Sequence, residues 1–237
     1  MAKVSGLGTR LYAAGYDLSS DVNALAGMGY TQAMLDVTTL DLAAVARIAG
    51  ISDGTLSVNG WFEQAGQHAA WTSNSGKIPT ADQIVIVQLG TALGDAMIGM
   101  VAKQATYGIT RAPGSALATT AEYQSTGGVQ LDFGIMLTTS KQTDASATAS
   151  SGVDEAAATL VGAVAYLEVM SVGSGTAVVV VEDSANNSSW ATIGTFTGAT
   201  GQTSQRLAIG GTVRRYVRCS STDTFTNAVF ACGLARL

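Results

Sequence analysis

The sequence has few charged residues. Only 12% of its 237 residues are Asp, Glu, Lys or Arg, against roughly 25% in an ordinary soluble domain. So few charges leave little to solvate the surface of a monomer, and the composition is typical of a chain whose surface lies largely against neighbouring subunits. A glycine-rich β protein with a bland Ser/Thr surface would have the same composition, so composition alone leaves both interpretations open.

Histidine and cysteine are also scarce. His68 is the single histidine, and the chain has two cysteines. A zinc site needs several Cys or His at short spacing. A histidine-based triad would have to include His68, near which neither a GxSxG elbow nor a cysteine occurs. We therefore expect no catalytic, metal-binding or cofactor-binding residues, and interpret His68 as a surface or packing residue.

Clustered cations and long apolar runs are missing as well. The formal net charge is −5, which argues against a nucleic-acid grip, because such a grip needs clustered Lys and Arg. No apolar run reaches the ~20 residues that span a bilayer, and the N-terminus lacks the apolar core of a signal peptide. These absences predict synthesis in the cytoplasm without Sec-type export and no membrane insertion.

Cys219 and Cys232 flank a predicted hairpin, with strands over residues 213–220 and 227–236. With a turn at 222–223, the two cysteines would lie about 20 Å apart along the ladder at roughly 3.3 Å per residue. That separation is far beyond bridging distance. We therefore interpret both cysteines as small core residues on one face of the hairpin.

Alternation with a period of two dominates the rest of the chain and predicts strands. The clearest is 129–137, where Phe133 is expected on the buried face. Further strands are expected at 85–89 and 97–107, with two short ones within 10–18.

Two segments read as helix. Thr39 is a candidate N-cap for a helix that places Leu42, Val45 and Ile48 at i, i+3 and i+6 before Gly50 ends it. A turn at Asp53-Gly54 would follow. The second helix, over 63–71, is shorter.

Residues 138–159 are rich in Ser, Thr and Ala and hold a single bulky apolar residue. Such a stretch cannot bury a core and predicts a linker or mobile loop. We therefore expect an N-terminal domain over 1–140, a linker over 141–158 and a C-terminal domain over 159–237. Short strands with polar turns in the last part suggest a jelly-roll β-sandwich, so the fold class is mainly β with one or two short helices.

Two acidic segments are candidates for a catalytic or a calcium site. Glu63 lies near Trp61 and Trp71, as in a glycosidase, but aromatics packed in a core explain the cluster more simply. Residues 182–187 offer hard oxygen ligands for calcium without the EF-hand spacing, and an ordinary polar turn is the favoured interpretation.

A predicted strand near the C-terminus carries basic and aromatic residues at alternate positions. Arg214, Tyr216 and Arg218 would project from one face and contact an acidic polymer or a neighbouring subunit. The alternative is a solvated face balanced by Glu182 and Asp183. Stacking on sugars is a further possibility, for which the candidate residues are Tyr166, Trp190 and Tyr216.

Several segments resemble the tail-tube (major tail) proteins of siphophages that infect actinobacteria and their relatives. The resemblance spans most of the chain and rests on diffuse patterns. The segments in the N-terminal part that carry the resemblance are RLYAAGYDLSSDVNALAG, TTLDLAAVARIAGISDGTLSVNGWF and LGDAMIGMVAKQATYGI. In the C-terminal part, YLEVMSVGSGTAVVVVEDSANNSSWATIGTFTG and GTVRRYVRCSSTDTFTNAVFACGLAR resemble an appended, galactose-binding-like β-sandwich.

The resemblance implies a structural virion protein made in the host bacterial cytoplasm. Its N-terminal domains would form homohexameric rings that share an inner β-barrel and stack into a tube, where an acidic wall lets DNA pass without specific binding. The implied partners are the tape measure, the tail terminator and a baseplate or distal tail protein. The C-terminal sandwich would decorate the outside, and 141–158 would be a linker or an inter-ring arm. One rival function is carbohydrate binding through the C-terminal sandwich, whose ligands could include cell-surface glycans. The other is a glycosidase or esterase that uses Glu63 and another acid.

Overall fold

The computed structural model describes residues 6–72 and 76–237. It confirms a mainly β fold, with 56% strand and 2% helix. The helix is α1 (Gln67–Trp71), five residues long and within the expected segment 63–71. It is far too short to cross a membrane, and no other helix occurs among the described residues.

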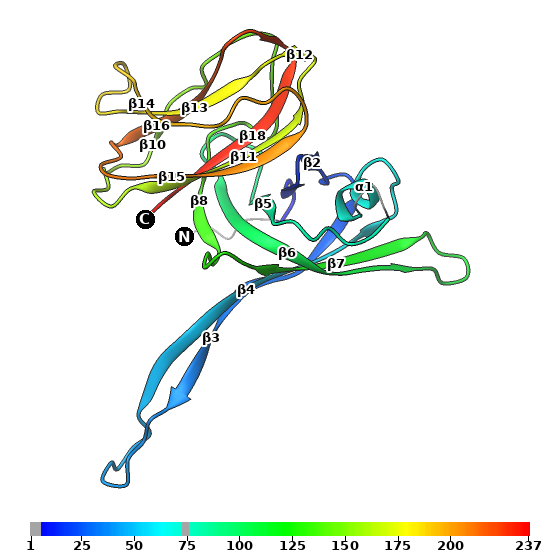
Figure 1. Cartoon of the computed structure of the whole chain (residues 1–237), viewed down its shortest axis with the longest axis vertical. Coiled ribbons are helices and arrows are strands. Elements are labelled where there is room, and N and C mark those ends of the chain that lie inside the picture. Colours follow the sequence, from blue (N-terminus) through cyan, green and yellow to red (C-terminus); the bar gives the residue numbers. More distant parts are fainter. Residues whose placement is uncertain (1–5, 73–75) are drawn as a thin grey trace.

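A twelve-stranded antiparallel sheet combines strands from both halves of the chain (Figure 1). Its main path runs β15-β11-β18-β8-β6-β5-β1-β2. The strands of this path are β1 (Arg10–Ala13), β2 (Tyr16–Asp17), β5 (Gln83–Gln88), β6 (Ala96–Thr110), β8 (Asp132–Met136), β11 (Ala163–Ser171), β15 (Thr203–Ile209) and β18 (Ala228–Arg236). The two short strands expected within 10–18 and the strands expected at 85–89 and 97–107 are therefore confirmed.

Two hairpins extend from this sheet. One joins β3 (Val22–Asp36) to β4 (Arg47–Trp61), and the other joins β6 to β7 (Ala118–Ser125). Because β4 also pairs with β7, the order β3-β4-β7-β6 makes a continuous four-stranded surface. The β3–β4 hairpin reaches far away from the body of the molecule (Figure 1).

A second sheet, of order β10-β16-β13-β14, contributes to the C-terminal core. Its strands are β10 (Val153–Asp154), β13 (Val178–Ser184), β14 (Ala191–Thr195) and β16 (Tyr216–Thr222). A small ladder joins β12 (Ser174–Gly175) to β17 (Phe225–Thr226). Alternate residues of β11, β13, β16 and β18 form the shared core, as period-two strands in two packed sheets should.

Two more apolar clusters organise the N-terminal half. One packs Trp71 of α1 against β4, β5 and β6. The other joins the halves, because Tyr12, Ile86 and Met97 pack with Val164 and Tyr166 of β11. The two halves of the chain are thus tied by both a sheet and a core.

The helix expected over 39–50 is wrong, since β3 and β4 frame a loop there. The ladder continues to Leu35 opposite Ile48, and Val37 donates its N–H to the Ala46 carbonyl. Leu42, Val45 and Ile48 are all exposed, so their helical spacing has no core to cover. The turn expected at Asp53-Gly54 is also wrong, because both residues pair within the β3–β4 ladder.

The hairpin proposed around the cysteines is wrong as well. β16 pairs with β13 and β10, whereas β18 pairs with β11, β8 and β9 (Gln142–Asp144). Cys219 and Cys232 are free and buried in one core cluster, which confirms their interpretation as core residues. Their expected wide separation is wrong, because the two thiols are hydrogen-bonded neighbours. The Leu137 carbonyl also accepts from the Cys219 thiol at 3.3 Å.

The strand expected over 129–137 is shorter, and its burial differs. β8 lies between β6 and β18 in the sheet, and its side chains are fully buried only at its C-terminal end. Met136 and Leu137 are buried, whereas Phe133 is 58% exposed beside Tyr30 of β3. The expected burial of Phe133 is therefore corrected.

The Ser/Thr-rich stretch contributes two short strands of its own. β9 (Gln142–Asp144) pairs with β18, and β10 pairs with β16. The buried carboxylate of Asp144 accepts a hydrogen bond from Ser221. Backbone pairing, together with Val153 packed against the C-terminal core, anchors this mainly polar segment, which composition could not reveal.

Candidate assembly surfaces

The residues proposed as surface or glycan contacts do not form one site. Tyr166 is fully buried, and its hydroxyl donates to Asp132 while Arg206 donates to the hydroxyl at 3.2 Å. Burial raises the pKa of Tyr166 far above its usual value. In this fold Tyr166 cannot stack on a sugar, so that prediction is corrected.

The arginines near the C-terminus are paired with acids of the neighbouring strand. Arg214 forms an ion pair with the buried Asp183 at 2.5 Å, and Arg218 pairs with Glu182 at 2.7 Å. These are the acids expected to balance the basic strand. Their pairing leaves little free charge on this sheet face to attract an acidic polymer.

The aromatic rings beside these arginines are also engaged. The Arg218 guanidinium lies 4.2 Å from the centre of the Trp190 ring, and Arg215 lies 5.1 Å from the centre of the Tyr216 ring. A sugar stacking on either face would have to displace an arginine. Hydrogen bonds from Arg215 also lower the pKa of Asp154 to about 2.

The acidic turn at 182–187 has its oxygens occupied. Glu182 and Asp183 bind the arginines, and the Asn186 side-chain oxygen accepts from the N–H groups of Ser188 and Ser189. Within 6–72 and 76–237, no group of three or more His, Cys, Asp or Glu is placed to hold a metal ion. The segment has the geometry of a polar turn.

The aromatic residues around Glu63 lie apart in the fold. Trp71 is fully buried, whereas Trp61 is half-exposed and Glu63 is exposed. His68 packs between Phe62 and Tyr107, and its Nδ1 is 2.8 Å from the Tyr107 hydroxyl. The histidine is thus a packing residue. The Asp21 carboxylate approaches Gly66 beside Glu63 and accepts a hydrogen bond from the Gln67 N–H at the start of α1.

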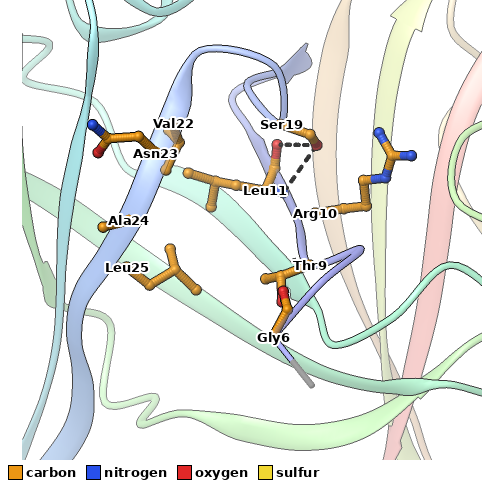
Figure 2. A pocket seen from close by; sticks show the side chains of 9 residues that line it. All are labelled: Gly6, Thr9, Arg10, Leu11, Ser19, Val22, Asn23, Ala24 and Leu25. Atoms are coloured by element: carbon orange, nitrogen blue, oxygen red, sulfur yellow. Dashed lines mark hydrogen bonds between the residues drawn. The ribbon is translucent and has the colours of Figure 1, made fainter. Parts of the chain in front are cut away.

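A cavity of about 440 Å³ lies between β1 and the start of β3 (Figure 2). Leu11 and Leu25 extend into the space between the strands, while the guanidinium of Arg10 extends to the other side (Figure 2). The Ser19 hydroxyl already bonds to Asp17 and to the backbone of Leu11. An open, mainly apolar cavity without converging polar groups gives a small ligand little orientation.

Exposed apolar side chains instead gather on the β3–β4 hairpin. Leu40 at the tip is completely exposed, and Ile51 is 87% exposed. The other large apolar residues exposed on this hairpin and its loop are Tyr30, Met34, Leu35, Val37, Leu42, Val45 and Ile48. An apolar surface of this extent marks an interaction site in a soluble protein.

The sequence contains a signal for this surface that our helix prediction missed. Residues 22–52 hold many apolar residues but only three charged ones, Asp36, Asp41 and Arg47. A segment with so few charges fits a surface that is covered in an assembly as well as it fits a buried helix.

Comparison with known proteins gives no match to a protein-family model or to a curated protein. Among solved structures, the chain is similar to one from the virion of a native gene transfer agent, with TM-score 0.41, 15% identity and coverage of 55% of this chain and 98% of that one. It is also similar to a chain from the tail of an empty gene transfer agent particle with C6 symmetry. The TM-score is 0.37 at 15% identity, with coverage of 48% of this chain and 82% of that one.

A third similarity is to the SPP1 Dit protein, described as a paradigm of the hub adsorption apparatus of phages that infect Gram-positive bacteria. Its TM-score is 0.34 at 6% identity, with coverage of 95% of this chain and 98% of that one. All three structures come from a virion, a tail or a tail hub.

Proposed function

We propose that this chain is a structural protein of a virion tail: a major tail-tube subunit whose hexameric rings stack into the DNA-conducting tube of a long-tailed bacteriophage. The observation that carries the proposal is the β3–β4 hairpin, which projects from the body and exposes apolar residues along its length. Such a surface is costly for a monomer and is stabilised when a neighbouring subunit covers it.

The open edge of β3 supports assembly through strand pairing. β3 is fifteen residues long and pairs with β4 on one side; on its other side none of the described strands lies against it. A long, open edge is a template for another chain. Closing a ring of identical subunits would cover it in every copy.

The exposed face of the β4–β7 ladder suits the wall of a DNA channel. Ser57 pairs with Glu122 and Asn59 pairs with Thr120, all on the face opposite the buried Leu56 side of the sheet. Lys103 on this face is paired with Asp82 at 2.7 Å. A wall of hydroxyls, amides and an acid, with its cation paired, offers phosphates little to bind.

Under this proposal the chain is not an enzyme, and its partners are further copies of itself together with the tape measure, the tail terminator and a baseplate or distal tail protein. DNA would pass without specific binding. Decoration of the tube by residues 159–237 belongs to the same proposal.

Sedimentation velocity over a range of concentrations tests self-assembly. We expect the wild-type chain to form large species. The combined substitutions Leu40→Ser, Leu42→Ser and Val45→Ser at the hairpin tip should raise the protein concentration needed for assembly by about tenfold or more, because three exposed apolar contacts are lost. The matched control changes Leu160, Val161 and Leu237, which are exposed but lie in the C-terminal half, to Ser. A wild-type chain that stays monomeric, or a control as defective as the tip variant, would contradict the proposal.

A further inference from the structure

The two hairpins lie at opposite ends of one sheet. In the β3–β4 ladder, Leu35 opposite Ile48 is close to the loop at 37–46. In the β4–β7 ladder, Trp61 opposite Ala118 is close to the loop at 111–117. Since β4 runs between these two points, the loops project from opposite ends of the same strand, as Figure 1 also shows.

Both ends expose apolar side chains. The β3–β4 end carries Leu40, Leu42 and Val45, and the β6–β7 end carries Trp61, Ile109 and Leu117, which are 36–48% exposed. The sheet therefore has one apolar surface at each end, separated by its mainly polar outer face.

The charges at the two ends are opposite. The β3–β4 end holds two acids, Asp36 and Asp41, and one cation, Arg47. Arg47 lies opposite Asp36 in the ladder without an ion pair to it, and the two carboxylates accept hydrogen bonds from Thr38 and Thr39. The β6–β7 end holds Arg111 and no acid between 105 and 121. Neither Asp41 nor Arg111 takes part in an ion pair among residues 6–72 and 76–237.

We propose that the β3–β4 tip of one copy docks on the β6–β7 end of the next copy, with Asp41 against Arg111 inside an apolar contact. The occupant of each end is thus a second copy of this chain. A contact between two different surfaces of identical subunits is heterologous, and when it does not close it propagates into an open stack. The inference rests on the proposed tube function and names the axial contact within it.

A charge-reversal cycle tests the pairing. Arg111→Asp and Asp41→Arg should each raise the concentration needed for assembly by about tenfold or more, because each places like charges together in the contact. The double variant should restore assembly to near the wild-type concentration. Both positions are exposed, so circular dichroism of the dissociated variants should match that of the wild type.

The control is Arg215→Asp, which reverses an exposed charge in the C-terminal half and should assemble like the wild type. Single variants that assemble normally, or a double variant no better than the singles, would overturn the Asp41–Arg111 contact while leaving tube formation intact. Failure of the wild-type chain to assemble would instead contradict the proposed function itself.

Discussion

Glu168 lies in an environment very different from that of an ordinary, exposed carboxylate. Its side chain is fully buried in β11, where one carboxyl oxygen accepts from the Gly15 N–H and the other has no hydrogen-bond partner among the described residues. Burial therefore raises the pKa of Glu168 well above its usual value. A protonated Glu168 joins the loop after β1 to the C-terminal half without placing a charge inside the protein.

Glu168→Gln should flatten the pH dependence of folding stability. In the folded chain Glu168 keeps its proton above its ordinary pKa, whereas the unfolded chain releases it, so the wild-type free energy of unfolding falls by about 1.4 kcal/mol per pH unit until the raised pKa is reached. Gln cannot release a proton and lacks this loss. Urea unfolding of the dissociated chain at pH 5 and pH 8 measures it, and parallel losses in the two proteins would contradict the assignment.

Phe133→Asp should be tolerated. Phe133 is mostly exposed, and its edge-to-face contact with Tyr30, with centroids 6.4 Å apart, is its main aromatic interaction. We expect a loss of about 1 kcal/mol. Leu137→Asp is the matched control, because Leu137 is fully buried and an unpaired charge there should unfold the chain. Thermal melts by circular dichroism compare the two, and unfolding by Phe133→Asp would refute the exposed position.

At the scale of elements, the sequence predicted strands wherever alternation met a core. β5 and most of β11 are buried on both faces, which agrees with their runs of apolar residues. The β3–β4 hairpin has no core beneath its tip, and its apolar spacing imitated a helix. Strand neighbours at long range, such as β18 beside β8, leave no local signal, which is why the cysteine hairpin was mispredicted.

The junction between β8 and β18 depends on a close backbone approach at Gly134. A Cβ at this position would collide with the Leu234 carbonyl and the Ala235 Cα. Gly134→Ala should therefore cost about 2–3 kcal/mol, measured by urea unfolding. Gly27→Ala in β3 is the control, because a Cβ there meets nothing within 4 Å. Equal stabilities of the two variants would contradict the packing of β8 against β18.

At the scale of the whole molecule, the boundaries of residues 1–140, 141–158 and 159–237 remain a prediction. β18 and β11 continue the sheet of the N-terminal half, and a core cluster is shared across it. The sequence could suggest a composition break at 141–158, but it could not reveal that both sides of the break share one sheet. The ion pairs of Arg214 with Asp183 and of Arg218 with Glu182 agree with the alternative interpretation of a charge-balanced face, and they form because β16 pairs with β13.

Removing residues 158–237 should therefore destabilise the N-terminal half. The truncation takes away β18, which pairs with β8, and exposes the cluster around Tyr12, Ile86 and Met97. We expect loss of the cooperative melt and aggregation of the truncated chain, because an open strand edge and apolar surface are exposed together. A truncated chain that melts cooperatively and forms tubes would show that these contacts are dispensable.

Negative-stain electron microscopy of the purified full chain tests the central claim most directly. We expect rings or tubes of uniform diameter with a central channel, which the hairpin-tip variant should fail to form. Particles without a channel, or single subunits at every concentration, would contradict a tube-forming function, and binding of such subunits to glycans would favour the carbohydrate-binding alternative.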